Sequence, residues 1–311
     1  MKICVVGAGL AGAVAANLLS KNHDVEVFEM REHIGGNCYD EINDGHNIHK
    51  YGPHIFHTDN DDIWQYVNRF AKFKEYKHSV IAKTYLGNTY VPVTNNSIFW
   101  DLCDDAIIKY IFEPYTFKQW GLPFNKVPKS ITNRLQMRRI GDDISYFLDK
   151  YQGIPIYSEM INNMLYGINI HLKCGEYDWR KYNFDIIIYT GRLDRLFNKT
   201  TLKYRTIDFK FYKSLTNLES AVINNCIYED RYTRVTDNSF WTNKIAPTIL
   251  TEEYPRNCEI DDIPCYPIND NIDDYLANLP CNVILCGRLA KHLYLDMDDT
   301  ITDVMQSIPE P

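Results

Sequence analysis

The sequence lacks several features that would assign it to a common class. It has no apolar run approaching the roughly 20 residues that span a bilayer, and no cysteine–histidine spacing typical of a zinc site. Basic residues are not in excess, since 33 lysines and arginines stand against 41 aspartates and glutamates, for a net charge of −8. These absences argue against a membrane-spanning protein, a metal protein and a general nucleic-acid binder. Any anion site must be a local basic cluster.

Paired cysteines are also missing. The nine cysteines form no CxxC pair and their number is odd, which favours reduced thiols over a disulfide framework. Only four apolar residues follow Lys2, too few for the apolar segment of a signal peptide. We therefore expect a cytoplasmic protein. The 45% hydrophobic and 24% charged residues are typical of a globular chain, and 311 residues leave room for two or three lobes.

The first 29 residues carry the clearest motif. An apolar stretch at 2–6, suited to a buried strand, leads into Gly7, Gly9 and Gly12, then a helix-forming stretch and a second strand that ends in Glu29. Such glycines permit a tight turn, a close approach to a pyrophosphate and close helix–strand packing, and the acid accepts hydrogen bonds from an adenosine ribose. The pattern predicts a dinucleotide site, and by itself leaves FAD and NAD open.

A histidine-rich segment follows, with His49, His54 and His57 around a Gly52-Pro53 turn. Clustered histidines can ligate a metal ion, but no cysteine or carboxylate stands at a matching spacing. The favoured interpretation is a turn whose backbone and imidazoles line a pocket.

Periodicity and turn residues predict the intervening elements, which are a helix over 63–70, hairpin strands 80–86 and 89–93, a helix over 97–120, a turn at 152–155 and a helix over 160–166. Gly87-Asn88 should form the hairpin turn, and Pro114 should interrupt its helix. Ser130 is expected to cap a short helix that carries Arg134 and Arg138 on one face.

Further Rossmann-type pieces are expected later in the chain. Strands are predicted at 168–172, at 184–191, which ends in Thr-Gly, and at 282–286, which leads into Gly287-Arg288. Alternation over 202–255 predicts an antiparallel sheet. Asp296 should cap a terminal helix whose first turn holds Asp298 and Asp299, where the helix dipole favours acids.

Nearly the whole chain carries an ordered set of motifs. In order they are Gly7–Val14, Arg31–Asn37, His49–Thr58, Lys118–Gly121, Tyr151–Pro155, Tyr189–Gly191, Tyr232–Arg234, Glu253–Pro255, Tyr266–Asp270 and Gly287–Ala290, followed by Tyr294 and Asp296-Met297. This set resembles one family, the UDP-galactopyranose mutases, FAD enzymes of galactofuranose biosynthesis. A glycine fingerprint alone is weak, whereas the ordered set is specific.

The resemblance implies an α/β fold with three domains. A discontinuous Rossmann-type FAD-binding domain takes 1–76, about 174–200 and 281–311. An inserted, reduced helical domain takes about 96–166, with a mobile loop near 118–134. An antiparallel β-sheet domain that binds substrate takes 77–95 and about 201–280.

The resemblance also implies an isomerase that interconverts UDP-galactopyranose and UDP-galactofuranose. In the family, N5 of reduced FAD attacks the anomeric carbon and displaces UDP, and the sugar passes through a flavin–sugar iminium before it closes through another hydroxyl. Two alternatives stay open: an amine-oxidase-like FAD oxidoreductase, and a nucleotide-sugar-binding protein without catalysis.

The site residues follow from matching these motifs. The expected cofactor residues are Gly7, Gly9, Leu10, Ala11, Gly12, Glu29, Met30, Arg31, Gly36, Asn37, His54, Ile55, Gly287, Arg288 and Met297. The expected catalytic residues are Arg134 and Arg234, whose guanidinium groups suit a diphosphate, and His57, beside the flavin. The expected substrate residues are His78, Phe112, Tyr115, Thr116, Trp120, Tyr146, Asn224, Glu253, Tyr266, Tyr294 and Asp296. No metal is expected.

The chain also departs from the family. Only about 27 residues separate Val93 from Trp120, so the helical insertion that commonly forms the family's dimer interface is trimmed, and the oligomeric state stays open. His78 stands where asparagine is usual. The expected partners are UDP-galactose, UDP-galactofuranose and an external reductant, either NADPH or a reductase, without nucleic acid or membrane. For a viral chain the location would be the host cytoplasm.

Overall fold

A five-stranded parallel sheet forms the base of the molecule. The computed structural model describes residues 1–132, 135, 138–175, 177–242, 246–268 and 270–308. The strand order of this sheet is β10 (Asn169–His171), β2 (Asp24–Phe28), β1 (Lys2–Val6), β11 (Ile186–Tyr189) and β17 (Val283–Leu285). Its strands come from the start, the middle and the end of the chain, which confirms the predicted Rossmann-type arrangement.

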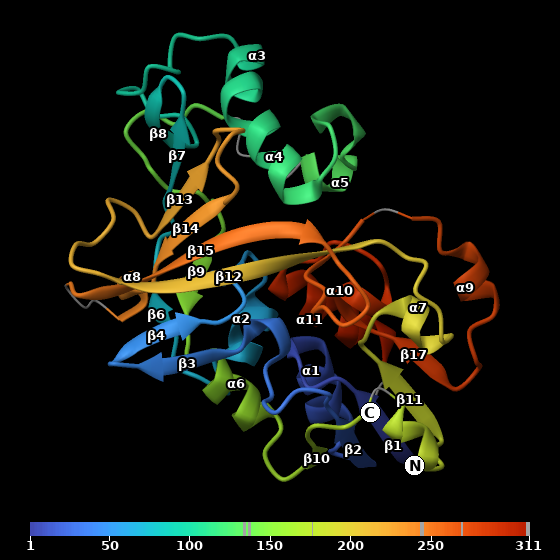
Figure 1. Cartoon of the computed structure of the whole chain (residues 1–311). Helices are drawn as coiled ribbons and strands as arrows, with labels where there is room; N and C mark the ends of the chain where they lie inside the picture. Colours follow the sequence, from blue (N-terminus) through green and yellow to red (C-terminus); the bar gives the residue numbers. More distant parts are fainter. Residues whose placement is uncertain (133–134, 136–137, 176, 243–245, 269, 309–311) are drawn as a thin grey trace.

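A seven-stranded sheet lies across the centre of the molecule (Figure 1). Its order is β16 (Tyr266–Pro267), β12 (Tyr204–Ser214), β15 (Thr248–Asn257), β14 (Arg234–Asp237), β13 (Val222–Asn225), β7 (Val80–Thr84) and β8 (Gly87–Val91). The predicted antiparallel pairing is confirmed from β12 to β13, but β13 pairs in parallel with β7. The predicted hairpin forms, and its turn is Tyr85-Leu86. Gly87-Asn88, which was expected to form the turn, begins β8.

Two small sheets flank the large ones. They are β3 (Asp40–Asn43) with β4 (His46–His49), and β5 (Phe56–Thr58), β9 (Tyr151–Ile154) and β6 (Lys74–Glu75), in which β9 is central. The prediction of a turn at 152–155 is therefore wrong. Gly153 made that stretch resemble a turn, but a Cβ there would lie 2.9 Å from the carbonyl oxygen of Lys74, so the glycine instead lets two strands approach.

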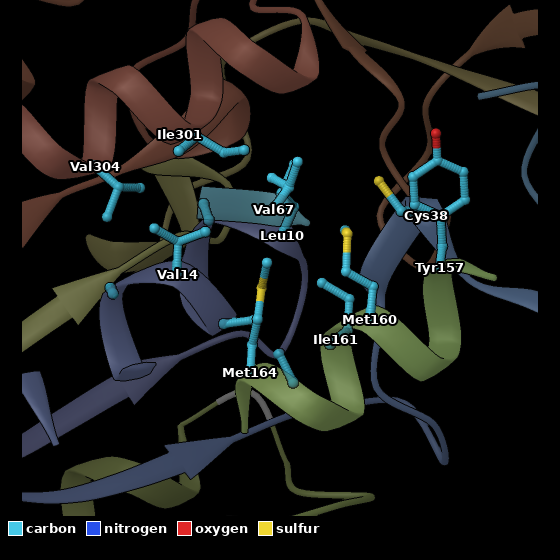
Figure 2. Close-up of a cluster of buried hydrophobic side chains, with 14 of the residues drawn as sticks. Leu10, Val14, Cys38, Val67, Tyr157, Met160, Ile161, Met164, Ile301 and Val304 are labelled. Carbon is cyan, nitrogen blue, oxygen red and sulfur yellow. The ribbon is translucent and has the colours of Figure 1, made fainter. Parts of the chain in front are cut away.

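The core of the Rossmann lobe is built by three helices, α1 (Leu10–Leu19), α6 (Tyr157–Met164) and α11 (Met297–Ser307). Figure 2 shows their buried side chains converging, with Leu10 and Val14 facing Ile301 of α11 and Met164 of α6. Seven of the ten α1 residues are apolar and buried, because the helix is covered by the sheet, α6 and α11. This packing holds the glycine loop ahead of α1 in place.

The remaining helices are α2 (Asp61–Val67), α3 (Asp104–Ile107), α4 (Glu113–Trp120), α5 (Lys129–Thr132), α7 (Leu193–Leu196), α8 (Ser239–Thr242), α9 (Asp273–Ala277) and α10 (Gly287–Ala290). Helices α3, α4 and α5 gather at one end of the molecule, away from the parallel sheet (Figure 1). The helix expected from residue 97 starts at Asp104. Pro114 does not interrupt it, because a π-helical stretch at Ile108–Phe112 lets the chain continue into α4.

The short helix predicted after Ser130 also differs. Helix α5 begins at Lys129 and ends at Thr132, so Arg138 lies beyond it, and Arg134 lies outside the described residues. Of the described helices, none is long and apolar enough to cross a membrane. All nine cysteines are free thiols.

Candidate functional site

A cavity of about 420 Å³ opens at the carboxyl ends of β1, β2 and β11. The predicted cofactor residues that line it are Gly7, Gly9, Leu10, Ala11, Glu29, Met30, Arg31, Gly36, Asn37, His54, Gly287, Arg288 and Met297. Two others do not line it. Gly12 packs α1 against the glycine loop, where a Cβ would lie 1.9 Å from the carbonyl oxygen of Gly7, and Ile55 is buried in the core.

Two glycine loops touch at one wall of the cavity. Gly9 and Gly35 form an isolated parallel bridge, and a Cβ on Gly36 would lie only 2.8 Å from the Cα of Gly9. Gly36 also has a φ of +56°, a conformation that favours glycine. Because α1 begins directly after Gly9, this wall presents a helix N-terminus behind a loop without side chains. That geometry suits a pyrophosphate.

Glu29 and Arg31 form the next wall. The Glu29 carboxylate is buried and accepts hydrogen bonds from the backbone N–H of Ala8 (2.7 Å) and of Arg31 (2.8 Å), which orients both oxygens. Each oxygen keeps a lone pair for a ribose hydroxyl. Arg31 donates to Asn37 Oδ1 (2.7 Å), while its other terminal nitrogen, Nη1, is buried with no hydrogen-bond partner in the described chain. These donors and acceptors fit an adenine dinucleotide.

Several cavity residues were missed by the sequence analysis. Trp179, Thr190, Arg192, Arg195 and Cys265 all line it. The Thr-Gly end of β11 was a usable signal for Thr190, because Rossmann ligands bind at the carboxyl ends of strands. The other four carry no local pattern.

The histidine-rich turn forms part of the cavity wall through His54. Its Nδ1 lies 2.8 Å from the carbonyl oxygen of Gly52, and its backbone N–H donates to His49 Nδ1 (3.0 Å). Burial lowers the pKa of both histidines to about 3, so both imidazoles are neutral. In the described part of the chain, no three histidine, cysteine or acidic side chains are grouped to hold a metal ion.

A buried charge pair lies on two adjacent strands of the large sheet, next to an asparagine on a third strand. Strand register places Asn224 of β13 opposite Arg234 of β14, and Arg234 opposite Glu253 of β15. Arg234 Nη1 lies 3.6 Å from Glu253 Oε1, and Arg234 also donates a short hydrogen bond to the hydroxyl of Tyr115. The structure thus brings together four predicted residues.

The electrostatics of this pair are set by burial. Glu253 is fully buried, and burial raises its pKa although Arg234 opposes the rise. Burial would lower the pKa of Arg234, but Glu253 and Tyr115 outweigh it, and that pKa lies well above its usual value. The guanidinium therefore stays charged, and its Nε is buried without a hydrogen-bond partner in the described chain. A free donor of this kind can take an anionic oxygen.

An aromatic row connects Trp120 with the cofactor cavity. The Trp120 ring centroid lies 5.4 Å from that of Tyr266 and 5.7 Å from that of Tyr294, and these two tyrosines stack at 5.7 Å. The guanidinium of Arg288, which lines the cavity, lies 5.4 Å from the Tyr266 ring and 4.8 Å from the Tyr294 ring. Two predicted substrate residues thus adjoin a predicted cofactor residue, and a third packs on both of them.

The Lys-Gln-Trp-Gly motif is anchored from both sides. Lys118 Nζ donates to the carbonyl oxygens of Ile227 (2.9 Å), Asp230 (3.3 Å) and Tyr232 (2.9 Å), and burial lowers its pKa to about 8. Arg205 donates to the carbonyl oxygens of Lys118 and Gln119, both at 3.0 Å. These contacts hold the end of α4, and with it Trp120.

Other predicted residues lie further from the cavity. Phe112 and Thr116 are buried on the helical side, where Phe112 belongs to a hydrophobic cluster that includes Tyr115 and Tyr146 at its edge. Asp296, expected among the substrate residues, by contrast lines the cofactor cavity at the start of α11, where its backbone N–H donates to Asp299 Oδ2 (3.1 Å). The predicted cap at Asp296 is confirmed.

His57 and His78 lie beside a segment that follows the undescribed loop residues. The ring of His57 stacks on Phe147 at 3.8 Å, and its Nδ1 lies 3.2 Å from Asp149 Oδ1. His78 is buried, which lowers its pKa to about 3, and its carbonyl oxygen accepts from the backbone N–H of Tyr146 (2.7 Å). The role of every one of these site residues stays a prediction.

Known proteins that are similar over nearly the whole length of this chain include nucleotide-sugar mutases. A family model described as UDP-galactopyranose mutase matches residues 110–294, and one described as an NAD(P)-binding Rossmann-like domain matches residues 5–70. The chain is 32% identical to a dTDP-fucopyranose mutase of Escherichia coli, over 98% of this chain and 97% of that protein. It is also 32% identical to a probable UDP-galactopyranose mutase of Klebsiella pneumoniae, over 99% and 94%.

The first of these alignments spans 365 residues, more than the 311 of this chain, so that relative carries segments absent here. Among solved structures, a reduced UDP-galactopyranose mutase matches with a TM-score of 0.68 at 10% identity, over 97% of this chain and 92% of that one. A putrescine oxidase with bound putrescine matches with a TM-score of 0.57 at 12% identity, over 98% of each chain. At these identities the structures show a shared fold.

Proposed function

Because the chain belongs to the UDP-galactopyranose mutase family, we propose that it is an isomerase that interconverts UDP-galactopyranose and UDP-galactofuranose with FAD as its cofactor. The observation that carries this proposal is the aromatic row of Trp120, Tyr266 and Tyr294 against Arg288. It puts the groups expected to hold the sugar nucleotide next to the cofactor cavity. An amine substrate carries no diphosphate for Arg234 to hold, so the buried, charged Arg234 also favours the mutase over an amine oxidase.

Held between the glycine loop, Glu29 and Arg31, reduced FAD would supply a nucleophile for displacement of the nucleoside diphosphate at the anomeric carbon. The side chains of this protein hold the departing diphosphate. Arg234 keeps its charge in a buried setting, where a guanidinium stabilises developing negative charge more strongly than in water. Tyr115 orients that guanidinium, and Glu253 balances its charge from behind. Arg134, outside the described residues, is expected to meet the diphosphate from the loop.

The direct test is product analysis. The purified protein, reduced with dithionite, is given UDP-galactofuranose, and the nucleotide sugars are separated by anion-exchange chromatography. We expect UDP-galactopyranose with the reduced protein and none with the oxidised protein. Absence of product despite bound reduced FAD would refute the proposal.

A pair of variants tests the role of Arg234. Arg234→Ala should lose on the order of 10²-fold in turnover, the usual effect of removing one group that stabilises transition-state charge. Arg231→Ala, an exposed arginine three residues away, is the matched control and should keep full turnover. Equal turnover in both variants would show that Arg234 does not meet the diphosphate.

A second candidate substrate is dTDP-fucopyranose, because the chain is as identical to the dTDP-fucopyranose mutase as to the probable UDP-galactopyranose mutase. Both nucleotide sugars should be assayed in parallel. A higher kcat/KM for the dTDP sugar would assign the chain to that substrate within the same reaction type.

An external electron source is also required, because the isomerisation has no net redox change and the flavin must be delivered in reduced form. NADPH is the first candidate. Loss of the oxidised-flavin absorbance on anaerobic addition of NADPH would support direct reduction, whereas unchanged absorbance would point to a separate reductase.

The trimmed helical insertion motivates a proposal on assembly: the protein is a monomer or a dimer through a different face. Light scattering over a range of concentrations should give 36.5 kDa for a monomer. A stable dimer that forms through helices α3 to α5 would contradict the proposal.

A further inference from the structure

The segment of residues 138–150, here called the strap, crosses the predicted substrate side without regular structure. Its backbone is held by side chains on either side. Arg138 Nη2 donates to the carbonyl oxygens of Ser145 and Tyr146, both at 3.0 Å. Gln152 Nε2 donates to the carbonyl oxygens of Phe147 (3.2 Å) and Asp149 (3.3 Å). The strap therefore has a defined path.

One side chain outside the strap is held between two of its residues. The Phe147 ring stacks on the His57 imidazole, with centroids 3.8 Å apart and planes 18° apart. Asp149 Oδ1 lies 3.2 Å from His57 Nδ1, and both side chains are mostly buried, at 24% and 15% exposure. Stacking restricts the plane of the imidazole, and the carboxylate lies at ion-pair distance from its Nδ1, which has no hydrogen-bond partner in the described chain.

His57 does not itself line the cofactor cavity, but its strand packs against an element that does. His57 lies on β5, which packs against α11, and the first residues of α11, Asp296 and Met297, line that cavity. Four titratable groups interact electrostatically with His57. They are Asp149 from the strap, Asp296 and Asp298 from the start of α11, and the neutral His78 ahead of β7. Its surroundings are thus acidic on two sides.

Burial alone would lower the pKa of His57. The carboxylate of Asp149 outweighs burial, with smaller contributions from Asp296 and Asp298, so the pKa of His57 lies above its ordinary value. The same contact lowers the pKa of Asp149. Both partners thus favour the charged pair.

We propose that Asp149 is a positioning residue for the isomerase: its carboxylate holds the His57 ring in place beside the start of α11, and it joins that region to the strap that carries Tyr146. The role of Asp149 in catalysis rests on the proposed isomerase function. The pairing of Asp149 with His57 is testable without any turnover.

The structural part is tested by NMR titration of the histidine ring signals of the full chain, with and without FAD. A spectrum of His57→Gln assigns the His57 signal. We expect the His57 titration midpoint to fall in Asp149→Asn, to be restored in Asp149→Glu, and to stay unchanged in Asp142→Asn. The last variant removes an exposed acid from the same strap. An unchanged His57 midpoint in Asp149→Asn would overturn the proposal.

The catalytic part is tested by the pH profile of kcat/KM. Loss of a charge-assisted contact should lower kcat/KM of Asp149→Asn about tenfold at neutral pH. The limb on which activity falls with rising pH should move to lower pH, since His57 then loses its proton sooner. A merely structural role for Asp149 would lower activity without moving this limb, and that result would overturn the proposal.

Two further outcomes keep the tests separate. Should Asp149→Asn fail to fold, the wild-type titration decides, because a His57 midpoint below the ordinary histidine value would overturn the proposal. A wild-type protein without isomerase activity would refute the proposed function. The shift of the His57 midpoint in Asp149→Asn would still support the positioning of His57.

Discussion

Replacing Arg234 with methionine removes one member of a buried charge pair. Glu253 is fully buried, its two carboxylate oxygens have no hydrogen-bond partner in the described chain, and the Arg234 guanidinium lies 3.6 Å away. At an effective dielectric constant of about 20, opposite charges at that distance attract by roughly 4 to 5 kcal/mol. Breaking a buried pair usually costs about 3 to 5 kcal/mol. We expect Arg234→Met to lower the free energy of unfolding by about that much where Glu253 is ionised.

The loss should depend on pH. Burial raises the pKa of Glu253 and Arg234 opposes that rise, so removing Arg234 should raise this pKa further. An acid with a folded pKa above its unfolded pKa binds its proton more tightly in the folded state. Stability then falls as the pH rises from the unfolded pKa through the folded pKa. Arg234→Met should therefore differ least from the wild type at acidic pH and most at mildly alkaline pH.

Urea unfolding at acidic, neutral and mildly alkaline pH measures this difference. The double variant Arg234→Met/Glu253→Gln should recover most of the lost stability, because it removes the unpaired carboxylate. The exposed Arg231→Met is the matched control and should unfold as the wild type does. The reasoning fails if Arg234→Met keeps wild-type stability throughout, or if the double variant is no more stable than the single one.

Three further predictions concern the cofactor wall, a buried cap and the aromatic row. Gly36→Ala should abolish FAD binding, because the added Cβ would lie 2.8 Å from the Cα of Gly9. The loss would be seen as missing flavin absorbance in the purified protein. Gly141→Ala is its control and should keep FAD, because Gly141 also has a positive φ but has open space around it. Asp40→Ala should lower the free energy of unfolding by about 1 to 3 kcal/mol, measured by thermal unfolding, because the Asp40 carboxylate accepts hydrogen bonds from the backbone N–H groups of Tyr157 (2.7 Å) and Ser158 (2.8 Å) at the start of α6. The exposed Asp142→Ala is its control and should change little. Addition of UDP should change the tryptophan fluorescence of the wild type, because Trp120 packs on Tyr266 and Tyr294. The fluorescence of Trp120→Phe should stay nearly unchanged. An equal change in both proteins would mean that the nucleotide binds elsewhere.

Features that depend on a few neighbouring residues were predictable from the sequence. The glycine turn, the strand ending in Glu29 and the cap at Asp296 follow from backbone freedom, apolar runs and local hydrogen bonds. The structure has the glycine turn and the cap where they were expected, and the second strand, β2, ends at Phe28, one residue before Glu29. The family resemblance extended this to the fold class, because its motifs are spread over nearly the whole chain.

Two predictions made from short sequence motifs were wrong. Gly153 and Pro155 suggested a turn, yet β9 lies between two strands and the missing side chain of Gly153 makes room for one of them. Pro114 suggested a break, yet the helix continues because a π-helical stretch precedes it. In both cases a residue that disfavours regular structure in isolation is accommodated by its neighbours in space.

The sequence by itself therefore determined the dinucleotide loop, the family and the types of residue available for chemistry. Only the tertiary structure decided which of these residues meet. Strand register brings Asn224, Arg234 and Glu253 into one row, and the path of the strap brings Asp149 to His57. No local pattern encodes these pairs, because a contact between residues far apart in the chain is set by sheet register and core packing. The electrostatics of the site depend on burial, which exists only in the folded chain.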